Sequence, residues 1–153
     1  MEQENSNTNQ PQGSNNAGFD IKSLPKSSIV IAIISAIGAI GVFLPWFSVS
    51  MGSMGLFGSI TVSGISRTWG LLTFLAFAGA IATSLFSKQM KLNEAISKNF
   101  PLYTGGGALL FSAIYFIRIL TSGYAGAAGF GLYISLLAGI ALVLIGFNII
   151  KIK

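Results

Sequence analysis

The sequence predicts an all-α membrane protein, a four-transmembrane-helix bundle with a β-hairpin-like outer loop between the first two helices. Only 8% of the 153 residues are charged, whereas a typical soluble domain carries roughly 25%. The chain also fits four apolar spans, each about as long as the ~30 Å hydrocarbon core of a bilayer. We expect a membrane domain at 28–153, with spans at about 29–47, 68–87, 102–120 and 130–150.

The segment before the first span, residues 1–27, is polar. Eight of its first twenty residues are Asn or Gln. Such a composition cannot bury enough apolar area to offset the entropy of ordering the chain. We therefore expect 1–27 to be a disordered tail, and the charge distribution below assigns it to the cytoplasm.

The first expected span, 29–47, contains nineteen residues without a charge. As a helix it would be about 28 Å long. It closes on Leu44-Pro45-Trp46-Phe47, where a proline is tolerable near a helix end. Amphipathic indole rings favour the membrane–water interface, so we expect Trp46 and, at the start of the second span, Trp69 to be interface anchors.

The connection between the first two spans predicts a β-hairpin. Residues 47–51 and 59–63 alternate apolar and polar side chains, and Gly52, Gly55 and Gly58 between them supply turn positions. An isolated hairpin is marginal in water. We therefore expect it to lie back on the outer ends of the helices, with four apolar side chains facing down: Val49, Met51, Ile60 and Val62.

The later spans are separated by a short cationic loop and a glycine-rich turn. Phe100-Pro101 is expected to open the third span, and the run 123–129 is expected to form the turn before Phe130 begins the fourth. The triple glycine 105–107 lacks the lysine and hydroxyl of a phosphate-binding loop. We expect it to be a flexible or closely packed start of the third span.

The cations set the expected threading, because cytoplasmic loops carry an excess of Lys and Arg. A cytoplasmic amino terminus leaves only Arg67 and Arg118 outside. The inside set then has seven members: Lys22, Lys26, Lys88, Lys91, Lys98, Lys151 and Lys153. We expect a multi-pass protein of the cell membrane with both termini in the cytoplasm.

The residues that usually carry catalysis are missing from the sequence. The chain has no His and no Cys, and so lacks the commonest general base and any thiolate. Its four acids, Glu2, Glu4, Asp20 and Glu94, all lie outside the expected spans, although coupled transporters usually need an intramembrane acid or His. We expect no enzyme, no catalytic, metal or cofactor-binding residue, and no nucleic-acid partner, since the cations stand at the ends of apolar runs.

Small residues recur at helical spacing, as in Ser35-x-x-x-Ala39, Ala76-x-x-x-Ala80 and Ser135-x-x-x-Gly139. Small faces let helix backbones approach closely in lipid. Packing within one bundle is the favoured interpretation, and dimerisation through the first span is the alternative.

Arg118 lies inside the third span, close to its outer end. An arginine costs ~2.5–3.5 kcal/mol at the centre of a span on insertion scales, and less near its end. The favoured interpretation is that its long stem lets the charge reach the headgroups, which predicts that Arg118→Lys is nearly silent. The alternative is that Arg118 binds an anion or lipid headgroup together with Arg67, which is predicted on the same side.

The sequence resembles small uncharacterised four-span bacterial membrane proteins in the residues Leu44-Pro45-Trp46-Phe47, followed by Gly58, Gly64 and Trp69-Gly70. The layout is also loosely similar to the claudin-like tetraspan arrangement, whose signature includes two loop cysteines that this chain lacks. We expect a non-enzymatic accessory or structural envelope component of a bacterial inner membrane, in contact with the lipid bilayer and with further copies or a membrane-protein partner. The alternative is a small oligomeric channel or transporter.

Overall fold

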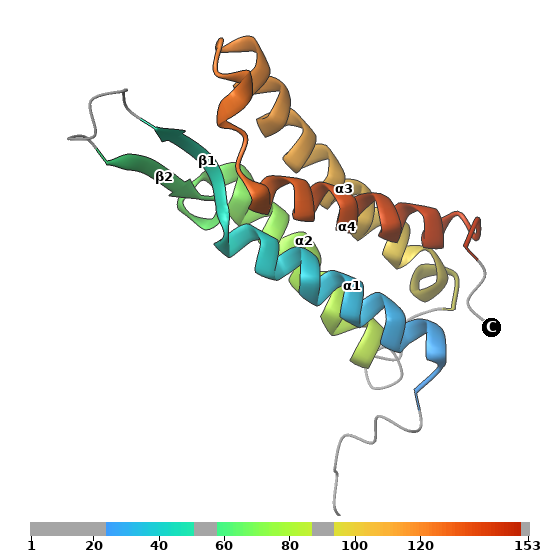
Figure 1. Ribbon diagram of the computed structural model, residues 1–153. Coiled ribbons are helices and arrows are strands. Elements are labelled where there is room, and N and C mark those ends of the chain that lie inside the picture. The colour runs from blue at the N-terminus through green and yellow to red at the C-terminus, as the bar shows by residue number, and fades with distance from the viewer. Residues whose placement is uncertain (1–23, 51–57, 87–93, 151–153) are drawn as a thin grey trace, which may run out of the picture.

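The computed structural model describes residues 24–50, 58–86 and 94–150, which form four α-helices and one two-stranded sheet (Figure 1). The helices are α1 (Lys26–Phe43), α2 (Thr68–Phe86), α3 (Glu94–Thr121) and α4 (Phe130–Gly146). The strands β1 (Pro45–Ser50) and β2 (Ser59–Ser63) follow α1, and short 3₁₀ turns η2 (Gly64–Ser66) and η3 (Ala125–Ala127) precede α2 and α4. The expected mostly helical architecture with a hairpin between the first two helices is confirmed.

The four helices form an antiparallel ring in which each packs against its neighbours in the chain and α4 closes against α1. Large side chains fill the centre: Val42, Phe77, Leu132 and Leu142 are all fully buried. Small residues lie where neighbouring helices contact each other. Gly41 of α1 lies close to the backbone of Gly131 and the Ser135 side chain on α4, so these small residues let the two helices of one bundle approach closely.

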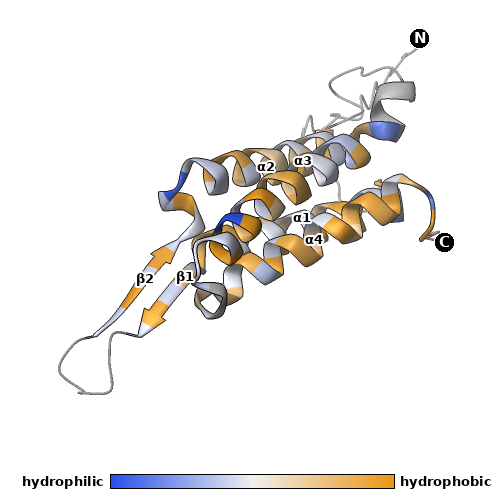
Figure 2. Ribbon diagram, turned by 90° about the horizontal axis from the view of Figure 1, so that it is seen from above, coloured by the Kyte–Doolittle hydropathy of each residue, from blue (hydrophilic) through white to orange (hydrophobic). Residues whose placement is uncertain are grey.

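Three of the helices are long and apolar enough to cross a membrane: α1, α2 and the 99–121 part of α3. The fourth, α4, is apolar but has 17 residues, which correspond to about 26 Å. Figure 2 shows hydrophobic colouring along all four helices. Large apolar side chains point outward from every helix, among them Ile40, Leu75, Leu110 and Leu137.

The first helix is displaced from the predicted span 29–47: α1 begins earlier, at Lys26, and it already ends at Phe43, because residues 45–47 belong to β1. The proline is the physical reason. A residue that precedes proline is pushed out of the α region by the proline ring, and Leu44 has the extended angles φ −75° and ψ 163°. The chain therefore changes from helix to strand at Leu44.

The third helix is longer than the predicted span 102–120. It begins at Glu94, so that Pro101 lies inside it rather than opening it. Residues upstream of the proline, such as Ala95 and Lys98, are good helix formers. Pro101 is the eighth residue of the helix, so it lies beyond the first turn and removes one backbone hydrogen bond of the helix there. Gly105 packs closely against Leu142 of α4, while a side chain at Gly106 would meet open space.

The hairpin does not lie back on the helices but extends beyond their ends (Figure 1). Val49 pairs with Ile60 in the sheet, and Ile60 is 48% exposed; Met51 falls outside the described residues. The outer part of β1, Ser48–Ser50, borders a pocket together with the connection between α3 and α4, and the base of the hairpin is fixed to the bundle by direct contacts. There Phe47 forms a bridge to Ala128, and the Gly129 amide donates to the Trp46 carbonyl oxygen at 2.9 Å.

Candidate functional site

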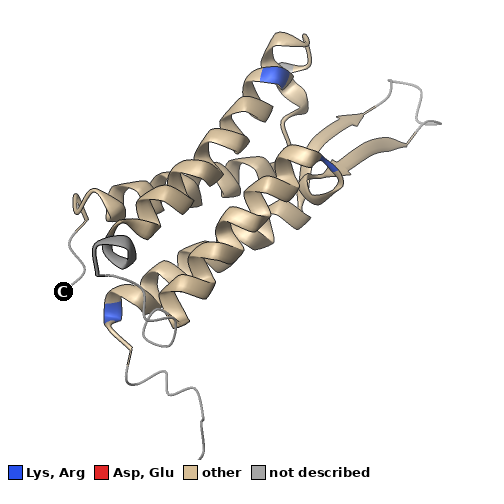
Figure 3. Ribbon diagram, turned by 180° about the vertical axis from the view of Figure 1, so that it is seen from behind, with Lys and Arg blue, Asp and Glu red and all other residues tan. Residues whose placement is uncertain are grey.

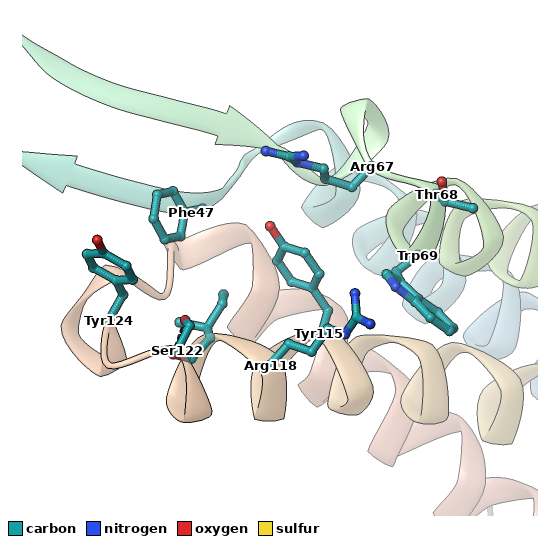
Figure 4. Close-up of a pocket in the computed structure, with 9 residues that line it drawn as sticks. Phe47, Arg67, Thr68, Trp69, Tyr115, Arg118, Ser122 and Tyr124 are labelled. Atoms are coloured by element: carbon teal, nitrogen blue, oxygen red, sulfur yellow. Dashed lines mark hydrogen bonds between the residues drawn. The ribbon is translucent and has the colours of Figure 1, made fainter.

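A pocket of about 580 Å³ opens at the hairpin end of the bundle. It lies between the hairpin base, the start of α2 and the last turns of α3, and Figure 4 shows its side chains. Its lining contains two arginines, four aromatic side chains (two of them tyrosines), one isoleucine, and the aliphatic hydroxyls of a threonine and a serine. The lining residues are Phe47, Arg67, Thr68, Trp69, Tyr115, Arg118, Ile119, Ser122 and Tyr124.

Arg67 is placed by the turn that joins the hairpin to α2. Its amide donates to the Gly64 carbonyl at 2.9 Å, which closes η2, and its own carbonyl accepts from the Leu71 amide at 2.9 Å. Arg67 therefore occupies the N-cap position of α2, where the backbone is fixed on both sides. Its side chain is exposed and lines the pocket.

Arg118 lies in the last turn of α3. A cation there interacts favourably with the negative end of the helix dipole, an effect of about 0.3–1 kcal/mol at exposed positions. Its carbonyl accepts hydrogen bonds from the Ser122 amide and the Thr121 hydroxyl, both at 3.1 Å. The side chain is exposed and lines the same pocket as Arg67, although 51 positions separate the two in the sequence.

The aromatic walls of the pocket are held by ring contacts. Tyr115 packs against the buried Trp46 with ring centroids 5.4 Å apart. Phe47 meets Tyr124 edge to face at 6.1 Å, and Trp69 meets Phe111 at 6.2 Å. Such aromatic pairs contribute about 0.5–1.5 kcal/mol each beyond their buried area, so they stabilise the walls of the pocket.

The charges of the described residues are separated along the bundle (Figure 3). Lys26 begins α1 at one end, whereas Arg67 and Arg118 line the pocket at the other. Glu94 is the only acid in the described ranges, and it lies 24 residues before Arg118 in α3, about 36 Å along the helix axis. No described carboxylate neutralises the two arginines.

The chemistry of this lining is suited to contact with an anion. Two guanidinium groups offer fixed positive charge and planar sets of N–H donors. Of the pocket hydroxyls, Ser122 donates to the Ile119 carbonyl oxygen at 2.9 Å and so is held by the backbone. Among the described residues no group of three or more His, Asp, Glu or Cys could hold a metal ion.

The structure brings together three of the four site residues named from the sequence: Arg67, Trp69 and Arg118 line one pocket. Trp46 does not lie on the surface of the bundle, where an anchor at the membrane–water interface was expected. Its side chain is 0% exposed, and its indole N–H donates to the Gly41 carbonyl oxygen at 3.1 Å. The indole thus finds its polar partner within the protein.

Six pocket residues were not named as site residues from the sequence: Phe47, Thr68, Tyr115, Ile119, Ser122 and Tyr124. For Tyr115 a signal exists, because residues three apart on a helix share a face and Tyr115 precedes Arg118 by three positions. Tyr124 lies in the glycine-rich turn, where the sequence carries no periodicity that would indicate its direction.

Comparisons with protein-family models, with curated proteins and with solved structures find no match to this chain. The site must therefore be interpreted from its own geometry.

Proposed function

We propose that the chain is a four-span integral membrane protein of a bacterial inner membrane, with both termini in the cytoplasm. It acts as a non-enzymatic accessory or structural envelope component by binding an anionic group in the Arg67–Arg118 pocket at the outer face. The observation that carries the proposal is the convergence of these two arginines on one pocket. The only acid in the described ranges, Glu94, lies at the other end of α3, so an anion in the pocket would meet a positive potential.

The apolar exterior of the bundle supports insertion into a membrane. Large exposed apolar side chains occur along all four helices, and a soluble monomer rarely exposes so extensive an apolar surface. In the fourth span, ~26 Å of helix is somewhat shorter than the hydrocarbon core, a mismatch that lipids accommodate at modest cost. The two arginines then lie near the outer headgroups, opposite Lys26.

The channel or transporter alternative receives less support. The centre of a single bundle is filled by Phe77, Leu132 and Leu142, which are fully buried. A path would therefore have to form between copies, and no feature of the described residues favours a particular contact between copies.

Binding of a simple anion tests the proposal. In purified protein at constant ionic strength, inorganic phosphate should raise the midpoint of thermal unfolding relative to chloride, because a ligand that binds only the folded state stabilises it. Arg67→Gln combined with Arg118→Gln should remove this increase. The matched control is Lys26→Gln, which removes one cation at the opposite end of the bundle.

Retention of the full phosphate effect in the double variant would refute the pocket as an anion site. Loss of the effect in Lys26→Gln as well would attribute it to net charge, and would refute the proposal equally.

A further inference from the structure

We propose that the edge of β1 that does not pair with β2 binds an extended, acidic segment of a partner protein at the outer face, and that a carboxylate of this segment contacts Arg67. The inference rests on the proposed function, because the carboxylate is the anionic group that the arginine pocket would bind. It also draws on the hairpin and on a second pocket beside it, which the proposed function leaves unused.

The second pocket, of about 430 Å³, lies between β1 and the connection from α3 to α4. We call it the strand pocket. Ser48–Ser50 line it on one side, and small residues predominate on the other, among them Gly123 and Gly126. A Cβ atom added at either glycine would meet nothing within 4 Å. Residues of this size let another backbone approach closely, so the strand pocket has room for an extended chain.

The backbone of β1 directs hydrogen-bonding groups toward the strand pocket. Phe47 forms an antiparallel bridge to the segment before α4. The hydrogen bond of this bridge joins residues next to the bridged pair, because the Gly129 amide donates to the Trp46 carbonyl oxygen. The residues on either side of Phe47 therefore direct their backbone groups to this edge. Since the direction alternates along a strand, Ser48 and Ser50 both direct their N–H and C=O groups to the strand pocket.

Beyond the bridge, this edge of β1 pairs with no strand in the part of the chain that the structure describes. The three residues Ser48–Ser50 offer about 10 Å of edge. An unpaired edge is a template for a further strand, and addition of a strand is a recurring mode of peptide recognition. A strand that continues the antiparallel bridge runs opposite to β1, so its carboxyl end lies toward the bundle.

The charges at that end of the strand pocket favour an acidic segment. Tyr124 lines both pockets and its ring meets Phe47 at 6.1 Å, so the strand pocket and the arginine pocket adjoin at this pair. Figure 4 shows Arg67 directed toward the strands, whereas Arg118 lies on the other side of the Tyr115 ring. A guanidinium binds a carboxylate through paired N–H donors. Arg67 is therefore the expected contact for an acidic residue at the carboxyl end of the added strand.

Binding of a designed peptide to the full chain in detergent micelles tests the inference. The probe is a fluorescent peptide of six alternating threonine and valine residues followed by two aspartates, with both ends blocked. We expect its anisotropy to show saturable binding at one peptide per chain. A peptide with two asparagines instead, or with the aspartates at its amino end, should bind at least tenfold more weakly.

Two proline variants compare the edges of the hairpin. Ser50→Pro removes an N–H group that faces the strand pocket. Thr61 pairs with Ser48, and because Ser48 directs its backbone groups away from β2, Thr61 directs its own to the far edge of β2. Proline is compatible with both positions, since neither N–H lies in the β1–β2 ladder. Ser50→Pro should weaken the acidic peptide at least tenfold, and Thr61→Pro should leave its affinity unchanged.

Two further pairs of variants test the pocket and the charge. Gly126→Leu adds a side chain to the lining of the strand pocket and should weaken the peptide about tenfold, whereas Gly58→Leu, at an equally open position outside that lining, should not. Arg67→Gln should weaken the aspartate peptide about tenfold and leave the asparagine peptide unchanged. Lys26→Gln should alter neither.

The outcomes distinguish this inference from the proposed function. If phosphate still stabilises the protein through Arg67 and Arg118, but the acidic peptide does not bind or Ser50→Pro and Thr61→Pro affect it equally, the partner assignment is wrong and the anion site remains. If phosphate has no effect and the peptide binds equally with asparagines, both proposals are wrong. Dimerisation of the protein that Ser50→Pro abolishes would assign the edge to a second copy, and would also overturn the inference.

Discussion

Trp46→Ala is expected to destabilise the protein more than any other single truncation at the hairpin base. The Trp46 side chain is fully buried, and removal of a buried tryptophan costs about 3–5 kcal/mol through lost contacts and the cavity left behind. The Gly41 carbonyl oxygen would also lose its indole donor. Because Tyr115 packs on the same ring, the aromatic wall of the pocket should loosen too.

The measurement is the free energy of unfolding in detergent micelles, followed by circular dichroism. Trp46→Phe is the graded variant, since it retains a ring but loses the N–H donor, and it should cost less than alanine. Trp69→Ala serves as the matched control, because Trp69 is only partly buried. A Trp69→Ala cost equal to that of Trp46→Ala would contradict the structural role assigned to Trp46.

Gly70→Ala should also be strongly destabilising, although alanine is normally favoured over glycine in a helix. A Cβ atom at Gly70 would overlap the carbonyl group of Gly64, which is backbone and cannot rotate away. Overpacking of this kind typically costs about 1–3 kcal/mol. Gly64 itself lies under the Trp46 ring, so the displacement would reach the hairpin base.

The same helix offers the matched control. A Cβ atom at Gly79 would lie 3.9 Å from the nearest Thr104 atom, an ordinary contact. Gly79→Ala should therefore be neutral or stabilising by up to about 1 kcal/mol, from helix propensity alone. The thermal midpoint should fall in Gly70→Ala and stay unchanged or rise in Gly79→Ala; a shared direction and size would show that the close approach of Gly64 and Gly70 is absent.

The number and order of the helices could be predicted from the sequence, because each long apolar run is by itself sufficient to indicate a helix. The hairpin could be predicted from its alternating side chains and glycines. The end of α1 could not be placed correctly, since hydropathy continues through Trp46 and Phe47 while the backbone has already left the helix at Pro45. A proline at this position is compatible with the last turn of a helix and also with the first residue of a strand, so the sequence does not distinguish the two.

The rotation of each helix about its own axis could not be predicted from the sequence. Helices that are apolar on all sides carry little directional signal, so the face of α3 that meets α2 cannot be inferred from hydropathy. For that reason Arg67 and Arg118 could be assigned to the same end, but not to the same pocket. The burial of Trp46 was missed because a tryptophan at the end of an apolar run is equally typical of a lipid-facing anchor.

The most direct test of the central claim, that both arginines lie in one pocket on the outer face, is labelling of single cysteines in intact cells. The chain has no cysteine of its own, so each introduced thiol is unique. Ser66 is next to Arg67 in the chain, and Ser122 lines the pocket four residues after Arg118. Ile149 follows α4 at the other end of the bundle. All three residues are exposed. We expect Ser66→Cys and Ser122→Cys to react with a membrane-impermeant maleimide without lysis, and Ile149→Cys to react only after permeabilisation. Labelling of Ser66→Cys without Ser122→Cys, or of Ile149→Cys in intact cells, would contradict the account.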